Sequence, residues 1–519
     1  MTVRTGDAER GQLEKLARRG SASVIGAGFS AVSGIVLVVI VTNGFPPVLA
    51  GTLFAATSAF LILEAVVLLG TDTGLVRWLP AHLASGRAQD VRCTLVVSLA
   101  PVLSLSAVGA ATLFVAAPAL APYLVGAEHE APMVTALRVL ALMLPVAAVH
   151  DVLLAATRGM GTMRPTVVVE NIGRLALQAG AVLGIYLFWA GALSLVLAWS
   201  LPYAVALVCS AVWLRLLLRR RAGAATGPAR SWRPVFREFW AYTAPRAVAR
   251  ITQTALKRSD IVLVAALSTP TNAALYTAAT RFIVFGQLLV QSVQQALAPH
   301  LSALFARDEG DAARAVFQAA TVWSMVPSWP IYLVTAGFAP TLMTIFGPGY
   351  EQASGVVVIL SLTMLFATAC GPVDSVLLMA GRSWLSLANS TVALVINLGL
   401  NFLLIPRNGI EGAAAAWSVA ILVRNLLPLL QVRHYLHMWP GTTASGYVAA
   451  GALLCFGVIS AVTQLAALPT LIAAVFVLLG GVAYLTGIWL LRGPLQLDAF
   501  RAGFARRRGR GLRAVHQCR

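Results

Sequence analysis

Charged side chains interrupt one apolar stretch of the sequence, residues 245–267, which reads PRAVARITQTALKRSDIVLVAAL. On a helix, which turns about 100° per residue, one stripe roughly 80° wide contains five polar residues: Arg246, Arg250, Gln253, Lys257 and Asp260. Arg258 lies outside this stripe. Arginine and lysine hold phosphate through charge-assisted hydrogen bonds, which a low-dielectric cavity strengthens. The residue types and their spacing predict a site for an anion at membrane depth.

A cation inside a bilayer needs water or an opposite charge beside it. Without either, it costs at least about 2.5–3.5 kcal/mol at the bilayer centre. Arg246 lies near the predicted start of the helix and can extend its charge to the surface. Lys257 lies about 16 residues from that start, roughly 24 Å along the axis. We weigh a hydrated cavity against a structural Lys257–Asp260 pair at i,i+3. We prefer the cavity, because the pair leaves the arginines unexplained.

Other apolar stretches add polar residues to the same predicted interior, namely Glu64, Arg281, Gln291, Asp374 and Arg424. His150 is better explained as a core residue that a neighbouring helix satisfies. Asp151 and Asp374 occupy nearly equivalent positions in two sequence repeats, so a structural role is their alternative. When the stripe is included, the interior contains several cations and few acids. A pyrophosphate carried on a lipid fits such an interior, and a cationic drug does not.

The elements that must position these residues are membrane helices. Hydrophobic residues make up 59% of the 519 residues and charged residues only 11%, against about 25% charged residues in soluble domains. Apolar runs of about 20 residues recur along the chain. The net charge of +19 comes from arginines near both ends and between the runs. The positive-inside rule explains this excess without a nucleic-acid partner.

The apolar runs predict an all-α integral membrane protein with about fourteen transmembrane helices and both termini in the cytoplasm. VLLAATR at 152–158 recurs as VLLMAGR at 376–382, and two further matches share an offset of about 220 residues. This repeat predicts two pseudo-symmetric six-helix lobes. The expected parts are an N-terminal lobe at 1–217, a basic cytoplasmic linker at 218–240, a C-terminal lobe at 241–433, and two added helices with a basic tail at 434–519.

Several enzyme classes lack their motifs in this sequence. The chain has only two lysines, Lys15 and Lys257, and neither lies in a G-x-x-x-x-G-K-[ST] motif. Neither H-E-x-x-H nor paired C-x-x-C occurs, and the five cysteines are scattered. The loops expected outside the cell are short, which argues against a membrane glycosyltransferase, polymerase or ligase. We therefore expect no enzyme activity, no cofactor and no metal.

Residues 256–310 and three later segments carry a family resemblance: FGPGYEQA, GPVDSVLLMAGR and NLGLNFLLIPRNGIEGAAAAWS. They resemble the polysaccharide transporter branch of the multidrug/oligosaccharidyl-lipid/polysaccharide exporter superfamily, the Wzx-type flippases. The resemblance implies a MATE-like, V-shaped pair of helical bundles with alternating access. It further implies that undecaprenyl-pyrophosphate-linked oligosaccharides move from the cytoplasmic to the outer leaflet of the inner membrane. Membrane lipids and the polysaccharide polymerase machinery are the other partners it implies.

By this similarity, cations such as Lys257 and Arg281 would bind pyrophosphate or acidic sugars. Acids such as Glu64 and Asp260 would balance charge or bind a coupling ion, H⁺ or Na⁺. The expected substrate-binding set is Arg246, Arg250, Gln253, Lys257, Arg281, Gln291 and Arg424, and the expected acidic set is Glu64, Asp260 and Asp374.

Two transporter alternatives stay open. Lipid II-type flippases of this superfamily carry arginines in their first helices, whereas residues 21–43 here carry no charge. Cation-coupled multidrug antiporters bind cations, which the cationic stripe disfavours.

Overall fold

The computed structural model describes residues 26, 28–188, 191–221, 231–466, 468–491 and 493. All regular elements in these residues are helical. Ten helices of the described chain are long and apolar enough to cross a membrane, or eleven if one bent pair is a single span. This confirms the predicted all-α integral membrane class.

The predicted number of fourteen crossings is not tested by this count. The helix α14 (Ser383–Leu436) counts once, although its backbone is non-helical at Gly409, where two helices meet. The helix α8 (Trp232–Leu267) contains the charged stripe and is not among the ten. Both discrepancies come from the criteria of length and charge, so fourteen remains a prediction.

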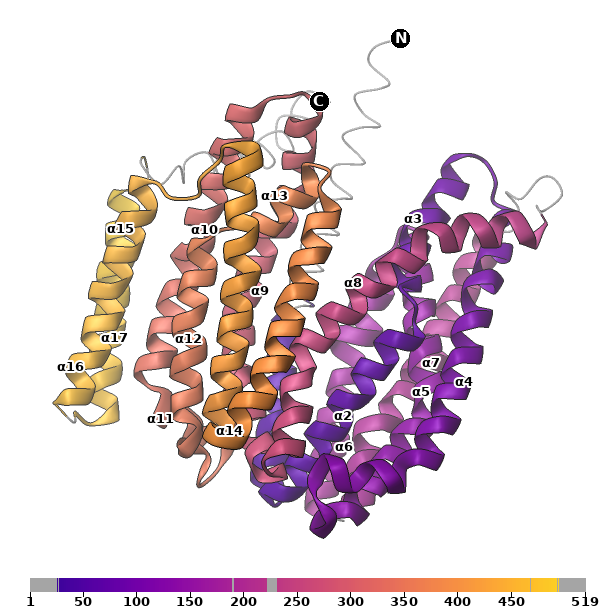
Figure 1. The fold of residues 1–519 in the computed structure, drawn as a ribbon, viewed down its shortest axis with the longest axis horizontal. Helices are drawn as coiled ribbons and strands as arrows, with labels where there is room; N and C mark the ends of the chain where they lie inside the picture. The colour runs from indigo at the N-terminus through magenta and orange to yellow at the C-terminus, as the bar shows by residue number, and fades with distance from the viewer. Residues whose placement is uncertain are drawn as a thin grey trace, which may run out of the picture. The chain divides into compact units, whose positions relative to one another are not determined.

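The chain forms two compact units. The first contains residues up to Arg281 with Met343–Ala353 and Ser390–Trp417. Its helices up to α8 run from indigo to magenta in Figure 1: Gly28–Gly44, α2 (Pro47–Val67), α3 (Thr71–Ala84), α4 (Asp90–Val125), α5 (Glu130–Gly159), the π-helix η2 (Thr166–Arg174), α6 (Leu175–Phe188), α7 (Ala192–Arg221) and α8. The start of α9 (Pro270–Ala306) and the middle of α14, which is orange, also belong to it.

The second unit contains Phe282–Leu342, Ser354–Asn389 and the chain from Ser418 onward. Its helices are the rest of α9, α10 (Gly310–Gly337), α12 (Ser354–Ala369), α13 (Val373–Met379), the ends of α14, α15 (Thr443–Ala452), the π-helix η6 (Leu453–Val458), α16 (Ile459–Leu465) and α17 (Thr470–Leu490). The predicted lobe boundaries stay a prediction. Residues 222–230 of the predicted linker and 494–519 of the predicted tail lie outside the described residues.

A break between α2 and α3 determines how α8 packs in the first unit. Leu69 and Gly70 have φ angles of 51° and 71°, and α3 begins immediately afterwards. A Cβ at Gly70 would lie 2.8 Å from the backbone nitrogen of Ala247 on α8. The missing side chain therefore allows α8 to lie directly against the break. Packing on α2, α3 and α4 buries one face of α8, including Phe239 and Thr243.

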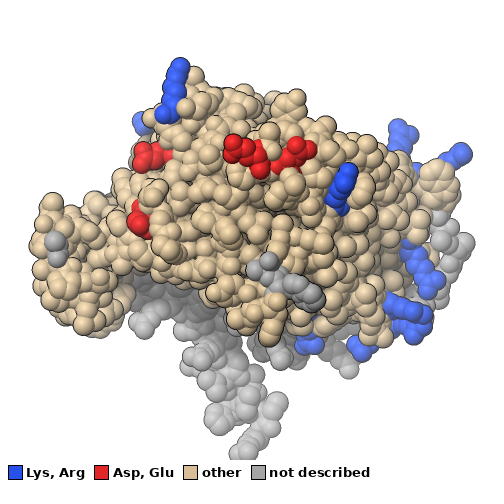
Figure 2. All heavy atoms as spheres, turned by 90° about the horizontal axis from the view of Figure 1, so that it is seen from below, with Lys and Arg blue, Asp and Glu red and all other residues tan. Residues whose placement is uncertain are grey.

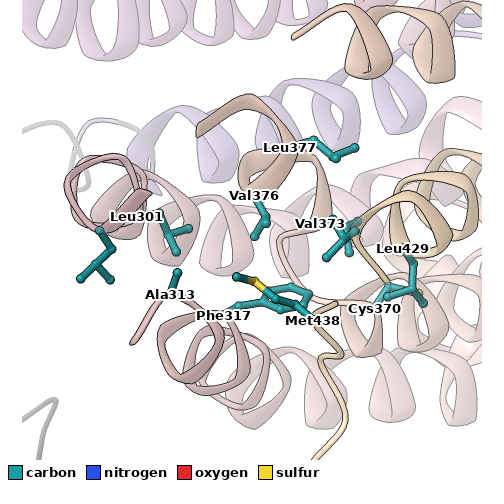
Figure 3. Close-up of a cluster of buried hydrophobic side chains, with 11 residues drawn as sticks. Leu301, Ala313, Phe317, Cys370, Val373, Val376, Leu377, Leu429 and Met438 are labelled. Carbon is teal, nitrogen blue, oxygen red and sulfur yellow. The ribbon is translucent and has the colours of Figure 1, made fainter. Parts of the chain in front are cut away.

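Apolar side chains from four helices form a core in the second unit. Figure 3 shows Leu301 of α9, Phe317 of α10, Val373 of α13 and Leu429 of α14 in this cluster. The two halves of α14 are also joined by paired amides, because Asn389 and Gln431 donate to each other's carbonyl oxygens at 2.7 and 3.0 Å. Apolar packing and amide hydrogen bonds thus hold these helices together, as expected in a membrane.

The surface is also that of a membrane protein. Large apolar side chains are widely exposed, with Phe188 at 84% and Leu465 at 88%. Figure 2 shows a face on which charged side chains are few and separated by uncharged surface. An exposed apolar surface of this extent requires contact with lipid or another apolar partner.

Candidate functional site

One open face of α8 carries four of the five residues in the predicted stripe. Arg246, Arg250, Gln253 and Lys257 are all exposed, and we call these four residues the α8 basic face. Asp260 does not share this exposure, since only 3% of it is accessible. The helical spacing therefore located the cations correctly on one side, while the acid at the edge of the stripe belongs to the interior.

Arg77 of α3 extends the α8 basic face. Its guanidinium carbon lies 4.0 Å from the ring centre of Tyr242, and that of Arg246 lies 4.4 Å from the same ring. Two cations thus share one tyrosine by cation–π contact. The sequence Gly70-Thr71-Asp72 before Arg77 is a helix-start signal, in agreement with its place on α3.

Arg250 connects the basic face to buried acids of the first unit. Its Nη1 lies 3.9 Å from Oδ2 of Asp72, and about half of the Arg250 side chain is exposed. The guanidinium also interacts electrostatically with Glu64 and Asp151. An exposed pair of this length contributes about 0–1 kcal/mol, so Arg250 can still engage a second anion.

Arg258 and Arg281 form a second cationic site in the first unit. Both side chains are half-buried and repel each other electrostatically. Arg281 donates its Nε–H to the carbonyl oxygen of Thr277 at 3.2 Å. Neither arginine has a carboxylate within ion-pair distance in the described part of the chain. We had set Arg258 aside because it falls outside the stripe, yet two desolvated cations without an acid require water or an anion.

A buried ion-pair network crosses the first unit at the π-helix η2. Glu170 accepts from Nε of Arg174 at 2.7 Å and lies 3.1 Å from Nε2 of His150. The Nδ1 atom of His150 lies 2.9 Å from the hydroxyl of Ser210. His150 is thus a fully buried residue with partners on neighbouring helices, as expected. Short π-helical segments are frequent at functional sites.

The same network reaches α6, α7 and α2. Arg174 donates to Oε1 of Gln178 at 3.0 Å and covers the ring of Tyr203 at 4.4 Å. Glu64 of α2 is 5% exposed and interacts electrostatically with Asp151, Glu170 and Arg174. Its Oε1 atom has no hydrogen-bond partner in the described chain. A buried carboxylate with an unused oxygen can accept a proton or a cation.

Asp260 belongs to a separate hydrogen-bond cluster of the first unit. Its carboxylate accepts from Nδ2 of Asn401 at 2.7 Å and from the Tyr276 hydroxyl at 3.2 Å. One turn before Asn401 on α14, Asn397 accepts from the Ser259 hydroxyl at 3.4 Å. Donors from α9 and α14 therefore hold the carboxylate of α8 in place, which the local pattern around Asp260 could not show.

The remaining candidates lie in the second unit. Gln291 is exposed on α9, and Arg424 is half-buried on α14. Asp374 of α13 accepts a hydrogen bond from the Ser386 hydroxyl at the start of α14. This contact suits a structural role for Asp374. In the described residues, no group of three or more His, Cys, Asp or Glu side chains is arranged to hold a metal ion.

Comparisons with known proteins agree with these features. The model of a family described as polysaccharide biosynthesis protein matches residues 54–355, more than half of the chain. A curated relative, the probable low-salt glycan biosynthesis flippase Agl15 of Haloferax volcanii, is 24% identical over 243 residues. The match covers 47% of this chain and 52% of Agl15, so the chain spans about half the length of this relative.

Solved structures with the same fold include transporters of several kinds. The lipid II flippase MurJ in an inward closed conformation has a TM-score of 0.69 at 13% identity, over 91% of this chain and 98% of MurJ. An inward-facing multidrug resistance MATE transporter gives 0.64 at 15% identity, over 79% and 94%. A MOP superfamily transporter from Pyrococcus furiosus, described as having a binding pocket of reverse polarity, gives a TM-score of 0.58 at 16% identity, over 82% of this chain and 95% of that one. The comparisons confirm the predicted resemblance and the MATE-like fold class.

Proposed function

Because the chain belongs to the polysaccharide biosynthesis protein family, we propose that it is a flippase for undecaprenyl-pyrophosphate-linked oligosaccharides. It moves them from the cytoplasmic to the outer leaflet of the inner membrane for surface polysaccharide synthesis. Its similarity to the probable glycan biosynthesis flippase Agl15 and to the lipid II flippase MurJ supports this class. The polysaccharide polymerase machinery would then take over the translocated unit.

The observation that carries the proposal is the unpaired cationic site of Arg258 and Arg281. Pyrophosphate offers several oxygens to the planar guanidinium group, which binds phosphate in a bidentate manner. The α8 basic face adds three exposed cations, Arg246, Arg250 and Lys257, and the contact of Arg250 with Asp72 is long, at 3.9 Å. An anionic cargo completes such a surface, whereas a cationic drug would be repelled.

Transport follows from these roles by alternating access of two lobes. The sugar would travel in the hydrated cavity while the polyprenyl tail stays in lipid. We assign cargo binding to Arg246, Arg250, Gln253, Lys257 and Arg281 in the first unit, and separately to Gln291 and Arg424 in the second. Glu64, with an unused oxygen, would bind the coupling ion, H⁺ or Na⁺, and Asp260, which already accepts two hydrogen bonds, would balance the charge. Both termini would lie in the cytoplasm.

A deletion strain tests the proposal. Cells that lack the gene would be complemented with the wild type, Lys257→Ala, Arg281→Ala or the control Arg233→Ala, which changes an exposed arginine at the start of the same helix. Lipid-linked glycans are then measured by mass spectrometry alongside surface polysaccharide. We expect a finished repeat unit to accumulate in the deletion strain and in both site variants, with normal levels for Arg233→Ala.

The outcome also separates the alternatives. Accumulation of a peptidoglycan precursor in place of an oligosaccharide would identify a lipid II-type flippase. Intact surface polymer with no lipid-linked species would reject the flippase, and drug-efflux measurements would follow.

A further inference from the structure

A basic cavity lies in the first unit, away from α8 and α9. It has a volume of about 320 Å³ and lies where α4 begins and α5 and α7 end. Its charged lining residues are Arg92 of α4 with Arg215 and Arg219 of α7, and its apolar lining includes Leu153, Leu214 and Leu218. None of the residues assigned to the cargo or the coupling ion lines it.

The three arginines of this cavity have no counterion in the described residues. None of them makes a hydrogen bond or an ion pair there. Arg215 and Arg219 are four residues apart on α7, a spacing at which like charges repel. Asp90 is close in sequence to Arg92, but it is completely buried and does not line the cavity. All three arginines are exposed, so an anion from outside the protein can reach them.

The cavity is amphipathic as well as basic. Leucines of α5 and α7 form its apolar wall, and exposed apolar residues lie nearby in sequence on α4 and α7, with Val96 at 65% and Val212 at 53%. The cavity therefore lies where a charged helix end meets surface suited to acyl chains. Basic pockets between transmembrane helices at the membrane surface bind the headgroups of anionic lipids.

We propose that this cavity binds an anionic phospholipid of the membrane, whose phosphate is held by Arg92, Arg215 and Arg219. An acyl chain lies along Leu153, Leu214 and Leu218. In the proposed orientation the lipid belongs to the cytoplasmic leaflet, where it joins the ends of α4, α5 and α7. This site is separate from the cargo site, and its test measures binding, so it holds or fails whichever cargo the protein moves.

Native mass spectrometry of the purified full-length protein tests the site. The protein is titrated with phosphatidylglycerol, with neutral phosphatidylcholine, and with inorganic phosphate. We expect the wild type to retain one phosphatidylglycerol in preference to the other two. Arg92→Gln/Arg219→Gln should weaken this binding by roughly 10- to 30-fold, because each arginine near a lipid phosphate contributes appreciably. The control Arg87→Gln/Arg220→Gln removes two cations from the same region but none from the cavity, so it should still retain phosphatidylglycerol.

A second variant separates the site from a folding defect and from diffuse charge. Leu218→Trp fills the apolar wall and keeps every charge, so it should also lose the retained phosphatidylglycerol while thermal unfolding stays near that of the wild type. Equal loss in the Arg87→Gln/Arg220→Gln control would show diffuse attraction and overturn the proposal. Equal binding of phosphatidylcholine would overturn it too, and tight binding of inorganic phosphate would show a site for a free anion instead.

Discussion

The α8 basic face and the carboxylates in the interior of the same unit differ in how their charges are compensated. Arg246, Arg250 and Lys257 point away from the packed interior, and Arg250 makes only a long contact with Asp72. Glu170 and Asp260 are enclosed by fixed donors from neighbouring helices. These cations are therefore accessible to a ligand, whereas Glu170 and Asp260 already accept hydrogen bonds from the protein. Glu64 is the exception, because it is buried and still has an unused oxygen.

The largest expected effect comes from breaking the ion pair of Glu170. Glu170→Ala leaves Arg174 buried beside Tyr203 without its carboxylate, and an uncompensated buried charge costs about 3–5 kcal/mol. We expect a large fall in the thermal unfolding temperature of the detergent-purified protein, while Lys257→Ala leaves it nearly unchanged. The double variant Glu170→Ala/Arg174→Ala should recover part of the loss. A wild-type unfolding temperature in Glu170→Ala would remove the distinction between the two regions.

A smaller effect on stability is expected at Glu64, the buried carboxylate with an unused oxygen. Glu64→Gln keeps the shape of the side chain and removes its charge, so we expect stability to change by less than about 1 kcal/mol, a typical net hydrogen-bond contribution. Transport driven by an imposed H⁺ or Na⁺ gradient in proteoliposomes should fall by about tenfold or more, since contacts to a charged group contribute about 1.5–3 kcal/mol. Gradient-driven transport at the wild-type rate would place Glu64 with the structural acids.

How much of the site could be predicted depended on whether a contact is local. The spacing of Arg246, Arg250 and Lys257 needs only the regular turn of one helix, and the structure shows their common exposure. The partner of Asp260, Asn401, lies 141 residues away in the sequence, so no local pattern could show that this acid is buried. Arg258 was set aside by the same helical spacing, because its importance comes from Arg281 on another helix.

Other features depend on departures from regular helix geometry. The apolar runs predicted the all-α membrane class, since about 20 apolar residues suffice to span a bilayer. Glu170 and Arg174 lie four residues apart in the π-helix η2, a spacing that could have suggested their pairing, but their contacts with His150 and Tyr203 on other helices could not be read from the sequence. The kink at Gly409 left the number of crossings untested, because two helices meet there.

The smallest expected effect concerns the edge of the α8 basic face, at Tyr242. Tyr242→Leu keeps an apolar side chain and removes the ring that Arg77 and Arg246 share. A cation–π contact at an exposed site contributes about 0.5–1 kcal/mol, so the apparent affinity for cargo should fall by roughly two- to fivefold, with unfolding unchanged. Cargo titration in proteoliposomes measures this, and Tyr242→Phe, which keeps the ring, should behave like the wild type.

If Tyr242→Phe loses as much affinity as Tyr242→Leu, the hydroxyl is what matters, and the two arginines are not held by the ring. If neither change alters affinity, the cargo does not reach this end of α8, and the basic face used in transport narrows to Arg250, Gln253 and Lys257.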